Sequence, residues 1–449
     1  MPYSEKVLSF LRSRKLEVGD EIKIKADDVE LEGFVLPREE LEFGDPDVLL
    51  LKLRSGYNAG IRVDRISSVE KLAGRVELER FPKLKEIRQD ESLPPISFIS
   101  TGGTVSSRVD YLTGGVAMLF SPEELLYGIP ELSGIVRVRA ADRLFSLASE
   151  DMRPAQWAEI SKRAVKLLSE GDRGVVVLHG TDTMHFTSAA LSFMIKGING
   201  PVVLTGAQRS PDRGSRDADL NVLSSARVAA FLPHALVCVV FHSSPSDDSA
   251  FVLRGTRLRK MHTSRRDAFR PINDLPVARV SRDGAIEVIQ RDLKPRSDEA
   301  PWADPVFEEK VALLSAYPNS NPEVMDFLLD RGYRGFVLQG TGLGHMPVQT
   351  IDDKGSWLPA IRRAKDQGAF VGMTSQCIYG RVDQFVYRNG RMLAEAGVTF
   401  LGDMLSEVAY VKLGWLLGHD FDVQDVRKMM LFNFAGEISD GDNPETFLY

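Results

Sequence analysis

Two short strand-to-turn stretches constrain the fold of this chain of 449 residues more than any other feature. Residues 99–105 (ISTGGTV) follow the apolar run 94–98, and residues 175–183 (VVVLHGTDT) begin with four apolar residues. Such apolar runs are typical of buried strands, and glycine lets the backbone turn sharply behind them. Ligands bind at the carboxyl ends of strands in an open parallel sheet. Two strand ends that both carry threonine hydroxyls therefore indicate a hydroxyl nucleophile rather than a nucleotide cradle.

The residues after these strands supply the candidate catalytic groups. A threonine hydroxyl is a poor nucleophile at neutral pH, so Thr104 and Thr181 need a base and an oxyanion site. Asp182 directly follows Thr181, and its carboxylate can hold a lysine that relays a proton. The candidate lysine is Lys260, in the stretch 257–263 (RLRKMHT). The alternative is that Asp182 and Thr183 only cap the helix that follows them.

Composition and charge limit the classes of protein. A hydrophobic content of 43% and a charged content of 27% are typical of a soluble globular protein, and the length suits two or three domains. The net charge of −7 argues against a strong nucleic-acid binder, because phosphate affinity needs clustered positive charge. A partner can still supply the basic surface.

The same sequence predicts a cytoplasmic protein without a membrane segment. The first residues lack the apolar core of a signal peptide. The most apolar region, 226–241, is interrupted by Arg227, Pro233 and His234, so it cannot span a bilayer. Cys238 and Cys377 lie far apart in apolar runs, which predicts two buried, reduced thiols.

The patterns divide the chain into three domains. Residues 1–90 form a β-rich N-terminal docking domain, because short alternating stretches such as Ile22 and Ile24 lie between turn residues. This segment has 17 basic and 19 acidic residues, so it is no basic platform. Residues 82–95 read as a linker. We expect a small β-barrel-like domain here.

Strands alternate with amphipathic helices from residue 91 to residue 295, which predicts a larger α/β domain with a parallel sheet and helices on both faces. The linker near 295–305 is rich in Asp, Glu and Pro. Residues 306–449 repeat the rhythm and predict a smaller C-terminal α/β domain. The fold class is therefore α/β, with a two-domain body behind the N-terminal domain.

Other motifs give weaker signals. The glycines at 102–103 and 340–344 (GTGLG) match neither dinucleotide nor Walker spacing. His179 and His185 flank a turn, and no Cys or His pair has ligand spacing, so we expect no metal. The run 257–270, with five arginines and Lys260, is either an RNA contact or a solvated or interface stretch.

Directly behind the first turn lies a segment without periodicity. Residues 106–118 include Tyr111 and two glycines, a composition that suits a mobile lid over the site. The alternative for Tyr111 is plain packing on the surface.

With these motifs in order, the chain resembles the L-asparaginase/glutaminase superfamily of threonine amidohydrolases. The resemblance runs from about 96 to 430 and rests on Thr-Gly-Gly-Thr at 101–104, Ser-Glu-Asp-Met at 149–152, His-Gly-Thr-Asp-Thr at 179–183 and Lys260. It implies Thr104 as the nucleophile, with Tyr111 on the lid beside it. It also implies a second triad of Thr181, Asp182 and Lys260. Ser149, Glu150 and Asp182 would bind the α-amino and α-carboxylate end of the substrate.

The β-rich N-terminal domain makes the chain similar to one branch of that superfamily, the D subunits of archaeal glutamyl-tRNA(Gln) amidotransferases. The stretches 265–269 (RRDAF) and 340–346 (GTGLGHM) support this resemblance. It implies that ammonia from glutamine or asparagine passes to an E subunit, which phosphorylates and amidates the glutamate of Glu-tRNA(Gln). ATP and magnesium would then lie on that partner, with no cofactor in this chain.

The resemblance further implies a homodimer, with two D and two E chains in the complex. The alternative is a free-standing L-asparaginase with an N-terminal regulatory domain. A pocket that grips the amino-acid end accepts both glutamine and asparagine, because one methylene discriminates weakly between them.

Overall fold

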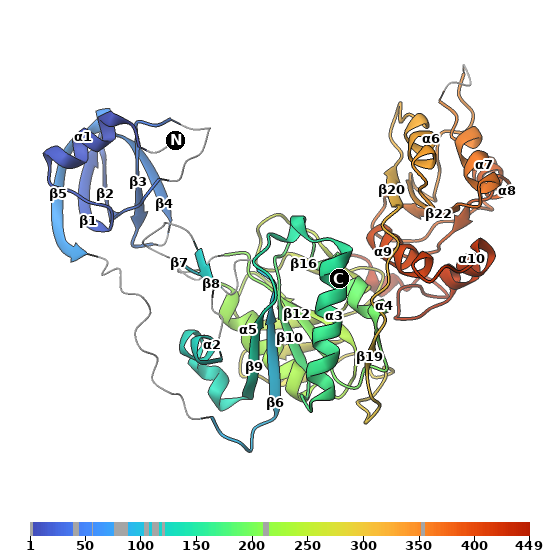
Figure 1. Ribbon diagram of the computed structural model, residues 1–449, viewed down its shortest axis with the longest axis horizontal. Helices are drawn as coiled ribbons and strands as arrows, with labels where there is room; N and C mark the ends of the chain where they lie inside the picture. Colours follow the sequence, from blue (N-terminus) through green and yellow to red (C-terminus); the bar gives the residue numbers. More distant parts are fainter. Residues whose placement is uncertain are drawn as a thin grey trace.

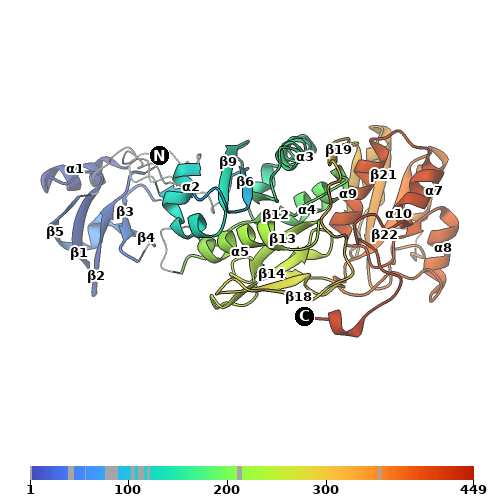
Figure 2. The same cartoon turned by 90° about the horizontal axis from the view of Figure 1, so that it is seen from below.

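Three structural units follow one another along the chain, and Figures 1 and 2 show them in a row. The computed structural model describes residues 3–38, 45–55, 57–75, 89–102, 107–109, 116–118, 122–209, 215–351 and 355–449. The N-terminal unit (blue) lies at one end, and the C-terminal unit (orange to red) lies at the other. The last residues of the chain return to the side of the central unit.

The N-terminal unit is an antiparallel sheet with one helix. The helix α1 (Glu5–Ser13) begins at Ser4, whose hydroxyl accepts a hydrogen bond from the N–H of Val7. The sheet has the order β4-β3-β2-β1-β5. Alternate side chains such as Ile22 and Ile24 are buried against the apolar face of α1, as the sequence pattern predicts. The strands are β1 (Asp20–Ala26), β2 (Val29–Val35), β3 (Val48–Leu53), β4 (Asn58–Arg62) and β5 (Ile66–Arg75).

An eight-stranded sheet with the order β18-β17-β14-β13-β12-β10-β6-β9 forms the central unit. Its neighbouring strands from β13 to β9 pair in parallel, as predicted, and the remaining pairs are antiparallel. The six residues 243–248 between β13 and β14 are too few for a crossover, so the chain must return antiparallel. The strands are β6 (Pro95–Ser100), β9 (Arg137–Arg143), β10 (Val175–Leu178), β12 (Val202–Thr205), β13 (Val237–His242), β14 (Ser249–Arg254), β17 (Ala278–Ser281) and β18 (Ile286–Val288).

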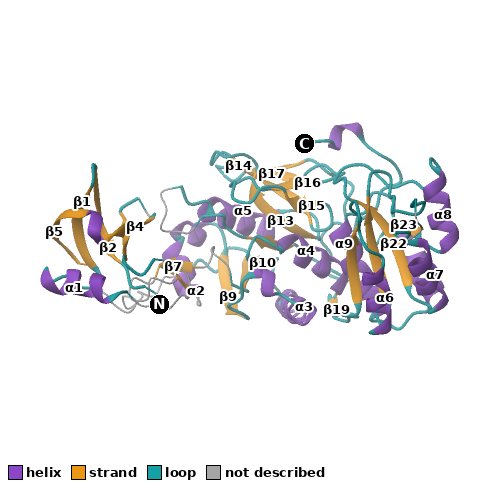
Figure 3. Cartoon of the chain, turned by 90° about the horizontal axis from the view of Figure 1, so that it is seen from above, coloured by secondary structure: helices purple, strands orange, loops and turns teal. Residues whose placement is uncertain are grey.

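Helices cover both faces of this sheet (Figure 3). Side chains alternate across a strand, so Val175 and Val177 pack on one face while Val176 and Leu178 pack on the other. The first face carries α3 (Pro154–Ser169) and α4 (Met184–Met194), and the second carries α2 (Pro122–Gly128) and α5 (Ala218–Phe231). The sandwich buries β10 completely, which explains its uninterrupted apolar sequence.

The C-terminal unit is a smaller parallel sheet with the order β20-β21-β22-β23. One of its apolar clusters joins residues of α4, such as Phe193, to residues of α9, such as Val408. The two α/β domains therefore share a core. The elements are β20 (Val311–Ser315), α6 (Glu323–Asp330), β21 (Gly335–Gly340), α7 (Leu358–Asp366), β22 (Phe370–Ser375), α8 (Arg388–Ala396), β23 (Thr399–Phe400), α9 (Ser406–Leu417) and α10 (Val423–Leu431).

Small antiparallel ribbons complete the fold. They pair β7 (Ser107–Val109) with β8 (Val116–Met118), β11 (Ile195–Lys196) with β19 (Trp302–Ala303), and β15 (Leu258–Lys260) with β16 (Phe269–Pro271). Thus β7 and β8 flank the expected lid, whose residues 106 and 110–115 lie outside the described ranges.

The two cysteines differ from the prediction in one respect. Cys238 is buried in β13, as expected, whereas Cys377 is exposed. The apolar strand β22 ends at Ser375, so Cys377 lies in the loop beyond it. None of the helices in the described ranges combines the length and apolar character that a membrane crossing needs.

A buried ion pair ties the C-terminal tail to α9. The side chains of Lys412 and Glu437 are fully buried, with Nζ and Oε1 2.6 Å apart. Lys412 also donates to the carbonyl oxygens of Met430 (3.0 Å) and Phe432 (2.5 Å). Removing one partner of such a pair leaves an uncompensated buried charge.

We therefore expect Lys412→Met to lower the free energy of unfolding by about 3–5 kcal/mol in guanidinium titrations. The matched control is Lys428→Met, which removes the exposed pair with Asp425 (2.9 Å) and should cost no more than about 1 kcal/mol. Equal losses in the two variants would contradict a stabilising role for the buried pair.

Candidate active site

The structure brings three of the predicted site residues into one hydrogen-bonded set at the carboxyl end of β10. The Nζ atom of Lys260 donates to Thr181 Oγ1 (2.8 Å) and to Asp182 Oδ1 (2.6 Å). The Lys260 side chain, at the end of β15, is 9% exposed, whereas that of Asp182 is 65% exposed. A mostly buried ammonium ion thus lies between a hydroxyl and a carboxylate whose second oxygen has no hydrogen bond among the described residues and can bind a ligand.

His179 shapes the turn that carries Thr181 and Asp182. Trp157 Nε1 donates to Thr187 Oγ1 (3.0 Å), and the Thr187 hydroxyl lies 2.9 Å from His179 Nε2. Because the Gly180 carbonyl can only accept, Nδ1 carries the proton of the neutral ring, and Nε2 accepts from the Thr187 hydroxyl. Nδ1 donates to the Gly180 carbonyl (2.6 Å) and holds this peptide in place. His179 is therefore a structural support for the turn.

Ser149 completes the turn from a distant part of the sequence. It begins the 3-10 helix η4 (Ser149–Asp151), and its Oγ accepts from the N–H groups of Asp182 (3.2 Å) and Thr183 (3.3 Å). With two bonds accepted, the Ser149 O–H can still donate to a ligand. Gly180 is required here, since a Cβ would lie 2.9 Å from Ser149 Cβ.

The capping alternative for Asp182 and Thr183 does not hold. Thr183 is the N-cap residue of α4 but makes no side-chain capping bond. Its hydroxyl donates instead to the Ser149 carbonyl (2.5 Å), and the Asp182 carboxylate binds Lys260. Glu150 is exposed, and within the described part of the chain its carboxylate has no hydrogen bond or ion pair.

The end of β6 lies beside this set. Thr101 is fully buried, and both its N–H (3.0 Å) and its hydroxyl (3.1 Å) donate to the carbonyl of Leu178. Gly102 has a φ of 123°, and a Cβ would lie 2.2 Å from the Leu147 carbonyl oxygen, so only glycine fits. Thr104 and Tyr111 lie outside the described residues. Thr104 follows Gly102 by two residues, a reach of about 7 Å at most.

The arginines of the run 257–270 have acidic partners, which favours the interface interpretation over an RNA contact. Their partners come from this ribbon, from the loop after β13 and from the C-terminal domain. The ion pairs are Arg257–Asp403, Arg259–Glu407, Arg265–Asp267, Arg266–Asp247 and Arg270–Asp267.

The glycine stretch 340–344 is not built as a phosphate cradle. The N–H of Thr341 donates to the His345 carbonyl, and the N–H groups of Gly344 and His345 donate back to the Thr341 carbonyl. These N–H groups are thus bonded within the turn and do not point toward a phosphate site. The described ranges also contain no cluster of three His, Cys, Asp or Glu side chains arranged for a metal ion.

Sequence reasoning missed the contacts that support the site. The bond of Trp157 to Thr187 joins residues 30 positions apart on two helices, and no local motif announces it. A cavity of about 830 Å³ between the two α/β domains, bordered by Lys196, Arg254 and Asp440, was also unforeseen. Among the described residues that line it, none belongs to the predicted catalytic set.

Family models and solved structures define the class of the two α/β domains. The model "Asparaginase, N-terminal" matches residues 95–294, and "Glutaminase/Asparaginase C-terminal domain" matches residues 310–430. The thermostable L-asparaginase from Thermococcus kodakarensis is similar, with a TM-score of 0.68 and 32% identity over 77% of this chain and 100% of that one. L-asparaginase I from Vibrio cholerae is similar with a TM-score of 0.64 and 27% identity. This match covers 78% of this chain and 100% of that one. The two domains thus form an asparaginase-type body.

Relatives that match almost end to end narrow this class. The model "GatD N-terminal domain" matches residues 16–72. The D subunit of the glutamyl-tRNA(Gln) amidotransferase from Pyrococcus furiosus is 46% identical over 447 residues, which cover 99% of this chain and 100% of that protein. The protein of that name from Methanopyrus kandleri is 47% identical over a match that covers 98% of this chain and 95% of that protein. The chain belongs to the GatD family, the D subunits of glutamyl-tRNA(Gln) amidotransferases.

Two buried histidines make stability depend on pH. Burial lowers the pKa of His179 to about 4. Burial, and then the positive charges of Arg259 and Lys260, lower the pKa of His185 to about 3. Both values lie below the unfolded value near 6.5, so the unfolded state binds more protons, and stability falls as the pH drops below about 6.5.

We expect each histidine to contribute a slope that approaches about 1.4 kcal/mol per pH unit between about pH 6 and 5, in urea unfolding curves of the wild type. His179→Gln should show a shallower slope over this range, because glutamine does not titrate. Parallel curves for wild type and variant would contradict a neutral, buried His179.

Proposed function

We propose that this chain hydrolyses the side-chain amide of glutamine or asparagine and supplies the ammonia to a partner that converts Glu-tRNA(Gln) to Gln-tRNA(Gln). The observation that carries the proposal is the bridge of Lys260 between Thr181 and Asp182 at the sheet edge, in a chain that matches its relatives over nearly its whole length. The relatives are named as amidotransferase subunits, and the solved neighbours are named as asparaginases.

In the proposed reaction, Thr104 Oγ attacks the amide carbon and loses its proton. The amide nitrogen takes up a proton and leaves as ammonia, so the acyl group remains as an ester on Thr104. Water then hydrolyses this ester to glutamate or aspartate and restores the hydroxyl. Backbone N–H groups at the glycine turns would stabilise the oxyanion, and Tyr111 on the lid would close over the site beside Thr104.

Lys260, Thr181 and Asp182 would move the proton. Asp182 holds the Lys260 Nζ at 2.6 Å, and Nζ reaches the Thr181 hydroxyl at 2.8 Å. Once Lys260 has given up a proton, its amine can take the proton of the Thr181 hydroxyl, and this short relay can activate an attacking group that is weak at neutral pH.

The exposed polar groups suit the amino-acid end of the substrate. The exposed carboxylates of Asp182 and Glu150 would bind the α-amino group, and the free O–H of Ser149 would donate to the α-carboxylate. This end is shared by glutamine and asparagine, so the pocket accepts both.

The N-terminal domain supports a role within a complex. The asparaginase from T. kodakarensis is covered completely while matching 77% of this chain, and residues 16–72 match a model that describes the N-terminal domain of GatD. We propose that this domain docks an E subunit that holds ATP and magnesium, in a cytoplasmic complex of two D and two E chains. A free-standing L-asparaginase with a regulatory domain is the alternative.

We expect Lys260→Met to lower kcat for amide hydrolysis by about 10²- to 10⁴-fold, because the proton relay is lost. KM should change less than kcat, because only Asp182 among the proposed binding groups contacts Lys260. The control Lys294→Met removes an exposed ion pair with Glu299 (2.7 Å) and should keep full activity. A Lys260→Met enzyme with normal kcat in an ammonia-release assay would refute the relay.

Partner dependence separates the two functions. Free hydrolysis would waste glutamine, so the purified chain should release ammonia slowly, and the E subunit with ATP and Glu-tRNA(Gln) should accelerate it. Full activity of the chain alone, unchanged by these additions, would instead identify a free-standing amidohydrolase.

A further inference from the structure

The strand that carries Lys260 has two faces with different tasks. Side chains alternate along a strand, so Leu258 and Lys260 share one face of β15 while Arg259 points the opposite way, and Arg257 directly precedes the strand. Leu258 is buried in the core of the central domain, and Lys260 reaches Thr181 and Asp182. Arg257 and Arg259 both pair with acidic residues of the C-terminal domain.

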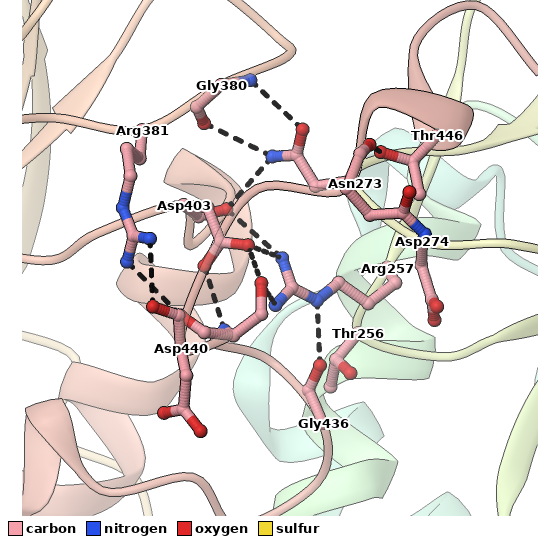
Figure 4. A network of polar contacts seen from close by, with 12 residues as sticks. Thr256, Arg257, Asn273, Asp274, Gly380, Arg381, Asp403, Gly436, Asp440 and Thr446 are labelled. Atoms are coloured by element: carbon pink, nitrogen blue, oxygen red, sulfur yellow. Dashed lines mark hydrogen bonds and ion pairs between the residues drawn. The ribbon is translucent and has the colours of Figure 1, made fainter.

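Arg257 makes the stronger of these two connections (Figure 4). It is 2% exposed, and its Nη1 donates to Asp403 Oδ2 (2.9 Å) and to the Asp403 carbonyl (3.2 Å). Its Nε donates to the Gly436 carbonyl (2.7 Å), and its Nη2 donates to Ser439 Oγ (3.2 Å). One guanidinium group therefore binds the loop before α9 and the C-terminal tail together.

Asp403 is itself held in place. It accepts from the N–H of Ser439 (3.0 Å) and from the Ser439 hydroxyl, and the Asp403 carbonyl also accepts from Asn273 Nδ2 (3.3 Å). Figure 4 shows Asp403 bonded both to Arg257 and to Asn273 of the central domain. The side chains of Arg257 and Asp403 are 3% and 2% exposed, so water competes little for this pair.

Arg259 adds a second connection beside the first. Its Nε lies 3.8 Å from Glu407 Oε1, in the first turn of α9. Asp403 and Glu407 thus present two carboxylates from one side of the interface, one to Arg257 directly before β15 and one to Arg259 within it. The far side of β15 has backbone support as well, because it pairs with β16 and the Arg257 carbonyl accepts from Ile272 N–H (2.9 Å).

We infer that Arg257 is a positioning residue for the proton relay: by anchoring β15 to Asp403, it holds the Lys260 Nζ at Thr181 and Asp182. Arg257 precedes Lys260 by only three positions, about 10 Å of extended chain. The placement of the C-terminal domain therefore sets the geometry of a site that lies in the central domain. This inference rests on the proposed function.

The first test substitutes Arg257→Lys in the full-length chain, assembled with its partner. Lysine keeps the charge but loses the fork of donors, so β15 is held less firmly. We expect kcat to fall by about 10- to 100-fold, the cost of a displacement of about 1 Å, with KM nearly unchanged.

Arg139→Lys is the matched control. Arg139 forms a similar fork with the buried Asp172 (2.7 and 2.9 Å), but this pair lies before the amino end of β10, opposite the site. It should keep the wild-type kcat. An equal loss of kcat in both variants would show a general effect on folding and would overturn the inference.

A double-variant cycle separates positioning from plain stability. If Arg257 acts through Lys260, Arg257→Lys should have no further effect on kcat in a Lys260→Met background. Losses that multiply would overturn the inference. Wild-type protein without ammonia release, alone or in the complex, would instead refute the proposed function, and the inference with it.

A second readout does not depend on activity. Asp403→Asn should raise the rate at which an amine-reactive ester labels Lys260, measured by mass spectrometry of the folded chain. Unchanged labelling of Lys260, with an unchanged melting curve, would overturn the inference and leave the amidase function standing.

Discussion

The ammonium group of Lys260, held between the Thr181 hydroxyl and the Asp182 carboxylate, is the interaction on which the site depends. A charge with so little exposure is stable only with partners close by, and both partners lie within 2.8 Å. They come from the end of β10, and the lysine comes from β15. The turn after β10 must therefore be held firmly, and the His179 and Ser149 bonds do so.

The two α/β domains act as one body around this set. The apolar cluster shared by α4 and α9 provides the contact area, and the Arg257–Asp403 pair gives it a defined register. Ser439 and Gly436 bring the C-terminal tail into the same network, and the buried pair of Lys412 and Glu437 fixes the tail to α9. A change in the C-terminal domain can thus reach the relay through β15.

Local signals in the sequence account for the parts that could be predicted. The strand β10 lies at the apolar run 175–178, where the sequence predicts a buried strand, because burial on both faces leaves a clear pattern. Thr181, Asp182 and Lys260 could also be predicted as candidate catalytic residues, since they lie in short motifs that sequence alone reveals. The structure then brought the three together.

The missed parts depend on contacts between distant residues. The antiparallel half of the central sheet follows from a loop too short for a crossover, which composition alone does not reveal. Arg257 and Asp403 lie 146 positions apart, so the run 257–270 looked the same whether it faced RNA or another domain. The apolar run before Cys377 predicts a buried thiol, but the strand β22 ends two residues earlier, so Cys377 is exposed.

The most direct test of this account identifies the nucleophile. A glutamine analogue with a diazoketone in place of the side-chain amide alkylates the attacking oxygen and releases dinitrogen. Mass spectrometry of the labelled chain should place the adduct on Thr104, and labelling should slow in Lys260→Met. An adduct on Thr181, or rapid labelling without Lys260, would contradict the assignment of nucleophile and relay.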